Sequence, residues 1–183
     1  MNPLLKGAVG RAAARAVQAA AKLSGAPSRP LNQAERGLAE PIFENSLDLF
    51  KVTVRAPVKG LVGITGRAFV IEDAIFVPAA YLPLAPPVLI HELVHVWQHQ
   101  HGGHGYIADS LHAQFLGEGY ALARAAAEQR PWYALNCEQQ ATLIEEAFSQ
   151  GFFTGKPVML GHHDATRWAE AAVQELRSGR GSR

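Results

Sequence analysis

The sequence predicts an α+β fold, in which a small antiparallel sheet lies beside one apolar helix and the C-terminal half is mostly helical. Three observations predict it. A helix-start signal is followed by short alternating segments, two adjacent prolines open a long apolar segment, and helical periodicity covers most of the remainder. The length of 183 residues suits one domain with tails.

One short helix and three strands are expected before residue 78. Asn32 and Glu35 have the spacing of a capping box, which predicts a helix from there towards Phe43. Residues 49–55 alternate between apolar and polar side chains, as a strand does. Residues 67–71 and 74–77 predict two further strands around a turn at Glu72 and Asp73.

The second half of the chain is expected to be helical. Pro86 and Pro87 suit the first turn of a helix, and the residues that follow them are largely apolar. The glycines between residues 100 and 105 predict a turn there, because glycine at that density ends helices. Helical patterns then cover residues 107–129, 138–150 and 164–177.

The charges divide the chain into a domain and tails. The formal net charge is +1, but residues 1–34 hold five basic residues and no acidic one (Lys6, Arg11, Arg15, Lys22 and Arg29). We therefore expect residues 1–30 to be a basic, alanine-rich tail and linker, residues 31–177 the domain, and residues 178–183 a disordered tail. The longest uncharged stretch, 74–90, is broken by four prolines and is not a transmembrane segment.

Residues 91–95 read His-Glu-Leu-Val-His, an HExxH motif inside the apolar segment. On a helix, His91 and His95 project from one face one turn apart, so both imidazoles can bind one Zn²⁺. Glu92 is placed to take a proton from a water that the metal activates. The motif thus predicts a zinc-dependent hydrolase with Glu92 as its general base.

A catalytic zinc ion usually has three protein ligands, and four residues compete for the third position. His101 fits the longer HExxHxxGxxH pattern, but Gln98 stands where that pattern needs glycine. His99 lies a full turn beyond the motif, and the helical rise carries it out of reach. Glu118 and Glu138 could each come from a second helix, and spacing alone slightly favours Glu118.

Hydrolysis of an amide also needs a hydrogen-bond donor for the developing oxyanion. Tyr133, just before the segment that contains Glu138, and His162, at the opening of the last predicted helix, are the first candidates. Other tyrosines and histidines could also serve (Tyr106, Tyr120, His104 and His163).

Two motifs together resemble a known family. HELVHVWQHQ at residues 91–100 and EQQA at residues 138–141 are similar to motifs of the bacterial zincin-like "vgr-related" proteins, and the resemblance extends over residues 31–153. That family is associated with type VI secretion. The resemblance implies a zincin-like fold and a metallopeptidase site of the HExxH…E type, with Glu138 as the third zinc ligand.

The sequence therefore predicts a zinc metallopeptidase that acts on a peptide or protein substrate. The alternative is a non-catalytic, zincin-shaped accessory or binding module of a secretion system. In either case we expect a component of the bacterial cytoplasm that a non-classical secretion system could export. No nucleic-acid partner is predicted. The glycine-rich residues 60–66 lack the context of a nucleotide-binding loop, so no phosphate site is predicted there either.

Overall fold

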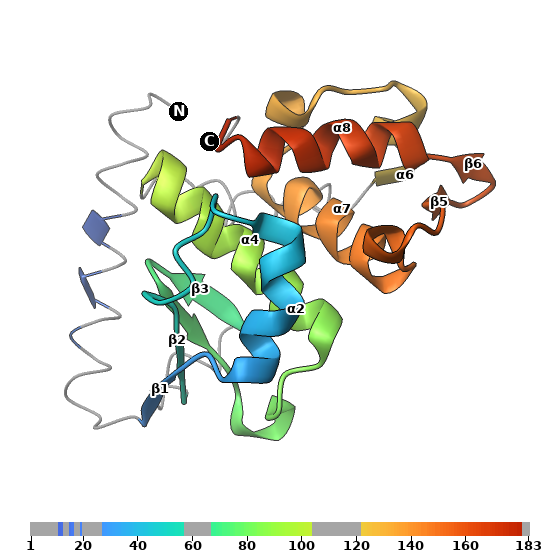
Figure 1. Cartoon of the computed structure of the whole chain (residues 1–183). Coiled ribbons are helices and arrows are strands. Elements are labelled where there is room, and N and C mark those ends of the chain that lie inside the picture. The colour runs from blue at the N-terminus through green and yellow to red at the C-terminus, as the bar shows by residue number, and fades with distance from the viewer. Residues whose placement is uncertain are drawn as a thin grey trace.

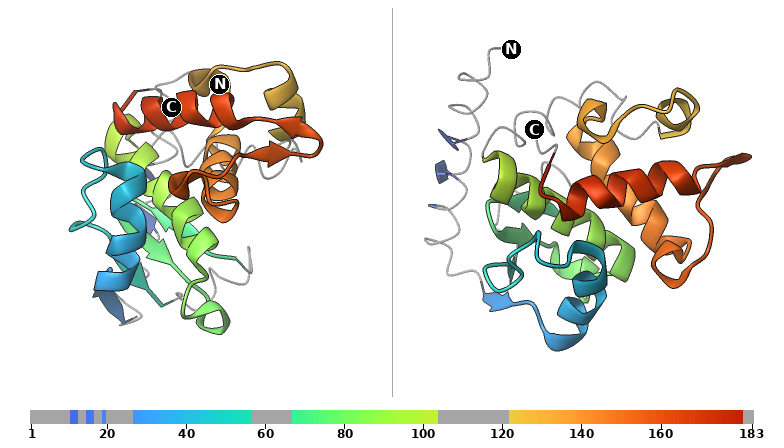
Figure 2. Two further views of the ribbon diagram at one scale, coloured as in Figure 1. Left: turned by 45° about the vertical axis from the view of Figure 1, so that its right-hand side comes forward. Right: turned by 45° about the horizontal axis from the view of Figure 1, so that its top comes forward.

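The structure is a computed structural model of the chain. It describes residues 11, 12, 15, 16, 19, 27–56, 67–103 and 122–180. These residues confirm the α+β class, with helix α4 (Pro86–Gly102) at the centre. A sheet contacts one side of α4 and helix α7 (Cys137–Ser149) contacts another. Helices α7 and α8 (Thr166–Arg177) lie on the side of α4 away from the sheet (Figures 1 and 2).

Helix α2 (Gln33–Phe43) begins at the predicted capping box. Asn32 Oδ1 accepts a hydrogen bond from the backbone N–H of Glu35 at 2.9 Å, and Glu35 Oε2 accepts one from the backbone N–H of Asn32 at 2.8 Å. Arg29 donates two further hydrogen bonds to the Glu35 carboxylate, at 2.6 and 2.7 Å. The chain that enters α2 is therefore tied to the first turn of the helix.

The four-stranded sheet is mixed, so the predicted antiparallel sheet is wrong in one pairing. Its order is β1-β2-β4-β3, with bounds Ser28–Pro30, Thr53–Arg55, Ala74–Phe76 and Phe69–Ile71 in that order. The outer pairs are antiparallel, whereas β2 and β4 are parallel. The predicted hairpin of β3 and β4 is present, but its second strand lies next to β2. The sequence does not reveal which strand of a hairpin lies against a third strand.

Strand β1 (Ser28–Pro30) also corrects the predicted domain boundary. The sequence assigned these residues to a linker that ended at Pro30, but they pair with β2, and Arg29 binds Glu35. A three-residue strand that follows one proline and ends on another carries no strand periodicity, so only the tertiary contacts reveal the pairing. The assignment of residues 1–26 as a tail remains a prediction.

The C-terminal half is mostly helical, as predicted. Helix α6 (Leu122–Ala127) matches the end of the segment predicted for residues 107–129, and residues 104–121 lie outside the described part. Helices α7 and α8 match the other two segments within about two residues, the usual uncertainty at helix ends. The remaining elements are short (η1 Ala79–Tyr81, η2 Trp132–Ala134, η3 Phe152–Thr154, β5 Met159–Leu160 and β6 His163–Asp164).

Helix α4 starts at the predicted prolines and ends later than predicted. Residues 100–102, expected in a turn, remain helical, and the chain leaves the helix at Gly103 with φ 71°. A glycine in the last turn weakens a helix without ending it, whereas a C-cap residue with positive φ leaves the helical backbone conformation and ends the helix. From Leu89 to Trp97 the apolar side chains of α4 are buried, among them Ile90 and Leu93, whereas Val88 in the first turn is exposed. None of the described helices has the length and apolar character needed to cross a membrane.

We predict that Glu35→Gln lowers the free energy of unfolding by about 1 kcal/mol at neutral pH, because Arg29 loses its charged partner. The Arg29 hydrogen bonds hold the pKa of Glu35 below its ordinary value of 4.5. A carboxyl group whose pKa is lowered by folding stabilises the fold at pH values above its ordinary pKa. This contribution is lost as the pH falls through the folded-state pKa. The difference in the free energy of unfolding between wild type and variant, measured by chemical denaturation, should therefore be full at neutral pH and should shrink as the pH falls below 4.5.

The matched control is Glu40→Gln, an exposed position on the same helix. It should leave the stability unchanged at every pH. A Glu35→Gln effect that persists undiminished at acidic pH would contradict a role for the charge.

Candidate metal centre

The first turn of α7 positions Glu138. Asn136 caps the helix, with its side chain accepting from the backbone N–H of Gln139 at 2.8 Å, and the Gln139 side chain accepts from the backbone N–H of Asn136 at 3.1 Å. Glu138 is the second residue of the helix, where the N-terminal end of the helix dipole favours a carboxylate. Ala141, one turn further on, is fully buried, and its small side chain permits α7 to approach α4 closely.

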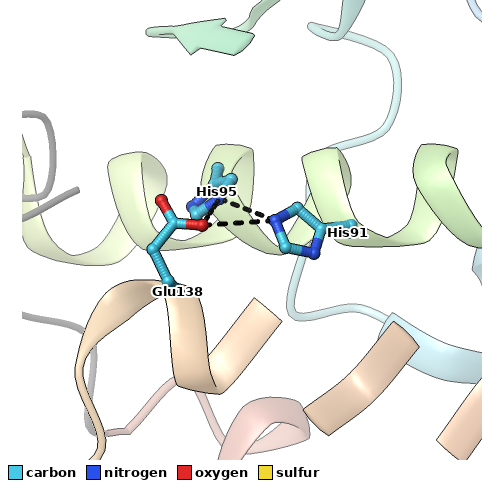
Figure 3. A group of neighbouring side chains, drawn as sticks. All are labelled: His91, His95 and Glu138. Carbon is cyan, nitrogen blue, oxygen red and sulfur yellow. Dashed lines mark hydrogen bonds and ion pairs between the residues drawn. The ribbon is translucent and has the colours of Figure 1, made fainter. Parts of the chain in front are cut away.

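The structure brings His91, His95 and Glu138 together (Figure 3). Their ligand atoms all lie within 4.8 Å of one another. The two histidine Nε2 atoms are 3.3 Å apart, and Glu138 Oε2 lies 3.4 Å from Nε2 of His91 and 3.6 Å from Nε2 of His95. Two imidazole nitrogens and a carboxylate oxygen thus converge on one point. This group could bind a metal ion.

The other ring nitrogen of each histidine has its own partner. His91 Nδ1 lies 2.9 Å from Glu145 Oε2, two turns beyond Glu138 on α7. His95 Nδ1 lies 2.8 Å from Gln98 Oε1, within α4. Histidines that bind metals usually donate this second N–H to a carboxylate, carbonyl or water, which fixes the orientation of the ring. Both histidines meet that condition.

The electrostatics of the cluster favour a positive charge at the convergence point. Burial by itself would lower the pKa of His91, but its hydrogen bonds to Glu138 and Glu145 outweigh burial and raise that pKa to about 10. Burial likewise opposes charge on His95, and the Glu138 carboxylate raises the pKa of His95 nevertheless. A cation at the convergence point would satisfy the same three acceptor atoms.

Glu92 lies beside the cluster without being one of its ligands. Its side chain is buried, and burial raises its pKa, while charges on His91 and His95 act in the opposite direction. Among the residues that the structure describes, Glu92 Oε2 has no hydrogen-bond partner. A buried carboxylate oxygen normally has one, and a water or substrate group at the cluster would supply it.

Two of the competing ligand candidates, His101 and His99, lie outside the cluster, and the third, Glu118, is not among the described residues. His101 Nδ1 bonds to the backbone oxygen of Trp97 at 2.9 Å, and the two rings stack with centroids 4.7 Å apart. His99 lines a polar hollow together with Asp48. Glu118 lies outside the described residues, so the structure does not test it.

The predicted oxyanion donors are placed on the surface. Tyr133 lies on η2 with 65% of its area exposed. His162 is exposed in the turn between β5 and β6, and α8 begins only at Thr166, so His162 does not open that helix. His163 is exposed on β6. The other candidates (Tyr106, Tyr120 and His104) lie outside the described residues.

Three residues at the site were not singled out from the sequence: Glu145, Gln98 and Gln140. Their spacing carried a signal, since Glu145 lies seven residues after Glu138 on α7 and Gln98 lies three after His95 on α4. Such separations place side chains on one helix face. In the sequence, Gln98 stands out only as the residue that breaks the longer zinc motif.

The chain is similar to part of the type VI secretion system spike protein VgrG2b of Pseudomonas aeruginosa. The two are 31% identical over an alignment of 153 residues, which covers 75% of this chain and 15% of the relative. The chain therefore spans less than a sixth of that protein. The similarity supports the predicted link to vgr-related proteins as a distant and partial one. No family profile and no solved structure match the chain, so the zincin-like part of the fold prediction is not confirmed.

We predict that Glu145→Ala weakens divalent-metal binding by about tenfold, because the His91 ring loses the partner that orients it. Glu146→Ala is the matched control. Glu146 is the next residue on α7 and accepts a hydrogen bond from Gln150, away from the histidines. Isothermal titration of the metal-free protein would measure both constants. Equal affinities for the two variants would contradict the role of Glu145.

Proposed function

We propose that this protein is a zinc-dependent metallopeptidase. The observation that carries the proposal is the convergence of His91, His95 and Glu138 from two helices, with Glu92 buried beside them. Two histidines and one glutamate form a donor set of catalytic zinc sites, which leave a fourth position for water. The hydrogen bonds to the outer ring nitrogens fit the same interpretation.

Each residue of the site has a defined role in the proposed reaction. His91, His95 and Glu138 would hold the ion. When bound, zinc supplies Lewis acidity, which makes a water molecule more acidic and polarises the scissile carbonyl. Glu92 accepts the proton of the attacking water at its available Oε2 atom and passes it to the leaving amine. The partner of the protein is then a peptide or protein substrate.

The similarity to a spike protein supports a second part of the proposal, which concerns cellular context. We place this protein with type VI secretion, either as a component or as a protein that the system exports. The rival function, a non-catalytic module of the same machinery, rests on this similarity alone. The buried carboxylate of Glu92 favours the peptidase, because a module without turnover has no use for a general base at a metal site.

The metal site is tested first. We predict about one zinc ion per chain, and a loss of that zinc in His91→Ala and in Glu138→Ala, because each removes one of three ligands. Metal analysis after dialysis against buffered zinc would measure the occupancy. His163→Ala, at an exposed histidine outside the cluster, should keep full occupancy. Full occupancy in His91→Ala would show that the site is wrongly assigned.

Glu92 is tested next. Glu92→Gln should retain zinc and slow peptide cleavage by at least about 100-fold, because a positioned general base contributes that much to the rate. Digestion of an unbiased peptide library by the zinc-loaded protein would identify a substrate on which the two rates can be compared.

Glu170→Gln, an exposed position on α8, should cleave like the wild type. Zinc binding without cleavage of any library peptide by the wild type would favour the non-catalytic module. Unchanged cleavage by Glu92→Gln would refute the assigned base.

A further inference from the structure

We propose that a buried amide relay fixes the tautomer of His95, so that Nε2 is always the nitrogen presented to the metal. The relay consists of the side chains of Gln98 and Gln140, and it ends on the backbone carbonyls of Cys137 and Trp132. This inference rests on the proposed metal site and explains how its second histidine is held.

The polarity of the relay is set at Gln140. Its Nε2 donates to the backbone oxygen of Trp132 at 3.0 Å. A backbone carbonyl can only accept a hydrogen bond, so the NH₂ group of Gln140 must face it. The reversed amide would place two oxygens against each other. The Gln140 oxygen therefore faces the other way, towards Gln98.

Gln98 transmits this polarity to His95. Its Nε2 donates to the backbone oxygen of Cys137 at 3.0 Å and to Gln140 Oε1 at 2.9 Å. Both hydrogens of the amide are thus engaged by acceptors, and the amide oxygen points to His95 Nδ1 at 2.8 Å. Because an amide oxygen only accepts, Nδ1 must carry the proton.

The tautomer follows from this order of donors and acceptors. A neutral imidazole with its proton on Nδ1 has its lone pair on Nε2, and Nε2 is the atom that faces His91 and Glu138. The side chains of Gln98 and Gln140 have no exposed area, so no solvent competes for their hydrogen bonds. Reversing either amide would oppose like groups in a buried environment, where unsatisfied polar atoms are costly.

The relay also links His95 to the segment that carries the third ligand. Trp132 lies on η2, shortly before α7, and Cys137 in the first turn of α7 directly precedes Glu138. The same hydrogen bonds therefore orient the His95 ring and set the position of the α7 start against α4. His91 is held differently, by the partly exposed carboxylate of Glu145. Gln98 and Gln140 are thus positioning residues that act through His95.

The tautomer can be read directly by nuclear magnetic resonance on the full 183-residue chain, loaded with zinc alone and with isotope-labelled histidine. The proposal requires a slowly exchanging proton on His95 Nδ1 and none on Nε2. Metal-free protein at a pH high enough to make the His95 ring neutral should give the same result. The metal-free measurement tests the relay even if the protein binds no zinc. Failure to bind zinc would contradict the proposed function and not the relay. A proton on Nε2 of a neutral His95 would overturn the relay.

Variants test the relay independently. Gln98→Met should weaken zinc binding by roughly 10- to 100-fold and speed exchange of the His95 Nδ1 proton, because the acceptor is lost. Gln100→Met is the matched control. It makes the same substitution on the same helix and removes hydrogen bonds to Asp48 and Asp73, away from the metal cluster. It should leave zinc affinity and the His95 proton unchanged.

Gln140→Met is the second variant. It leaves the contact of Gln98 with the Cys137 carbonyl in place, so its loss of zinc affinity should be smaller than that of Gln98→Met. Wild-type zinc affinity and wild-type proton exchange in Gln98→Met would overturn the proposal. If Gln98→Met fails to fold, the wild-type spectra and Gln140→Met still decide it.

Discussion

The packing of helix α4 against helix α7 is the contact on which the rest of the structure depends. It buries a row of polar side chains inside an otherwise apolar core, with His95 and Gln98 from one helix and Glu138 and Gln140 from the other. A buried polar group without a partner costs about 1–3 kcal/mol, so the two helices are stable only where these groups meet. The requirement fixes one register between them and assembles the candidate metal site.

The remaining elements hold this helix pair in place. The sheet contacts α4 through β3 and β4, and α2 contacts α4 from another side. At the C-terminal end of α8, Arg177 donates hydrogen bonds to the backbone oxygens of Pro41 and Ile42, which are left without helical partners near the end of α2. The cluster is therefore built on helices that are themselves braced. Sites on such elements keep a more precise geometry than sites on loops.

Two different kinds of support hold the two histidines of the cluster. The partly exposed carboxylate of Glu145 lies beside His91, whereas the buried, uncharged amide of Gln98 lies beside His95. A neutral amide suits a fully buried position, because a charge there would need its own compensation. A carboxylate suits the more accessible ring, because nearby solvent lowers the desolvation energy of a charged side chain. Of the three residues in the cluster, His91 has the most exposed side chain.

The sequence by itself determined the features that depend only on residues close to one another in the chain. The Asn32 capping box, the prolines that open α4, the hairpin of β3 and β4, and the helical spacing of His91 and His95 all follow from neighbouring residues. The third ligand was different. Spacing along the chain slightly favoured Glu118, and only the family resemblance indicated Glu138, which the structure brings to the histidines.

Tertiary structure alone decided the features that depend on contacts between distant segments. These are the parallel pairing of β2 with β4, the strand at Ser28–Pro30, and the partnership of Gln98 with Gln140. In the sequence, Gln98 is visible only as a departure from the longer zinc-binding motif. In the folded chain it is a buried link between two helices, because the acceptors that define its role come from residues about 40 positions away. Local propensities cannot encode a hydrogen bond whose partner is brought in by the packing of another helix.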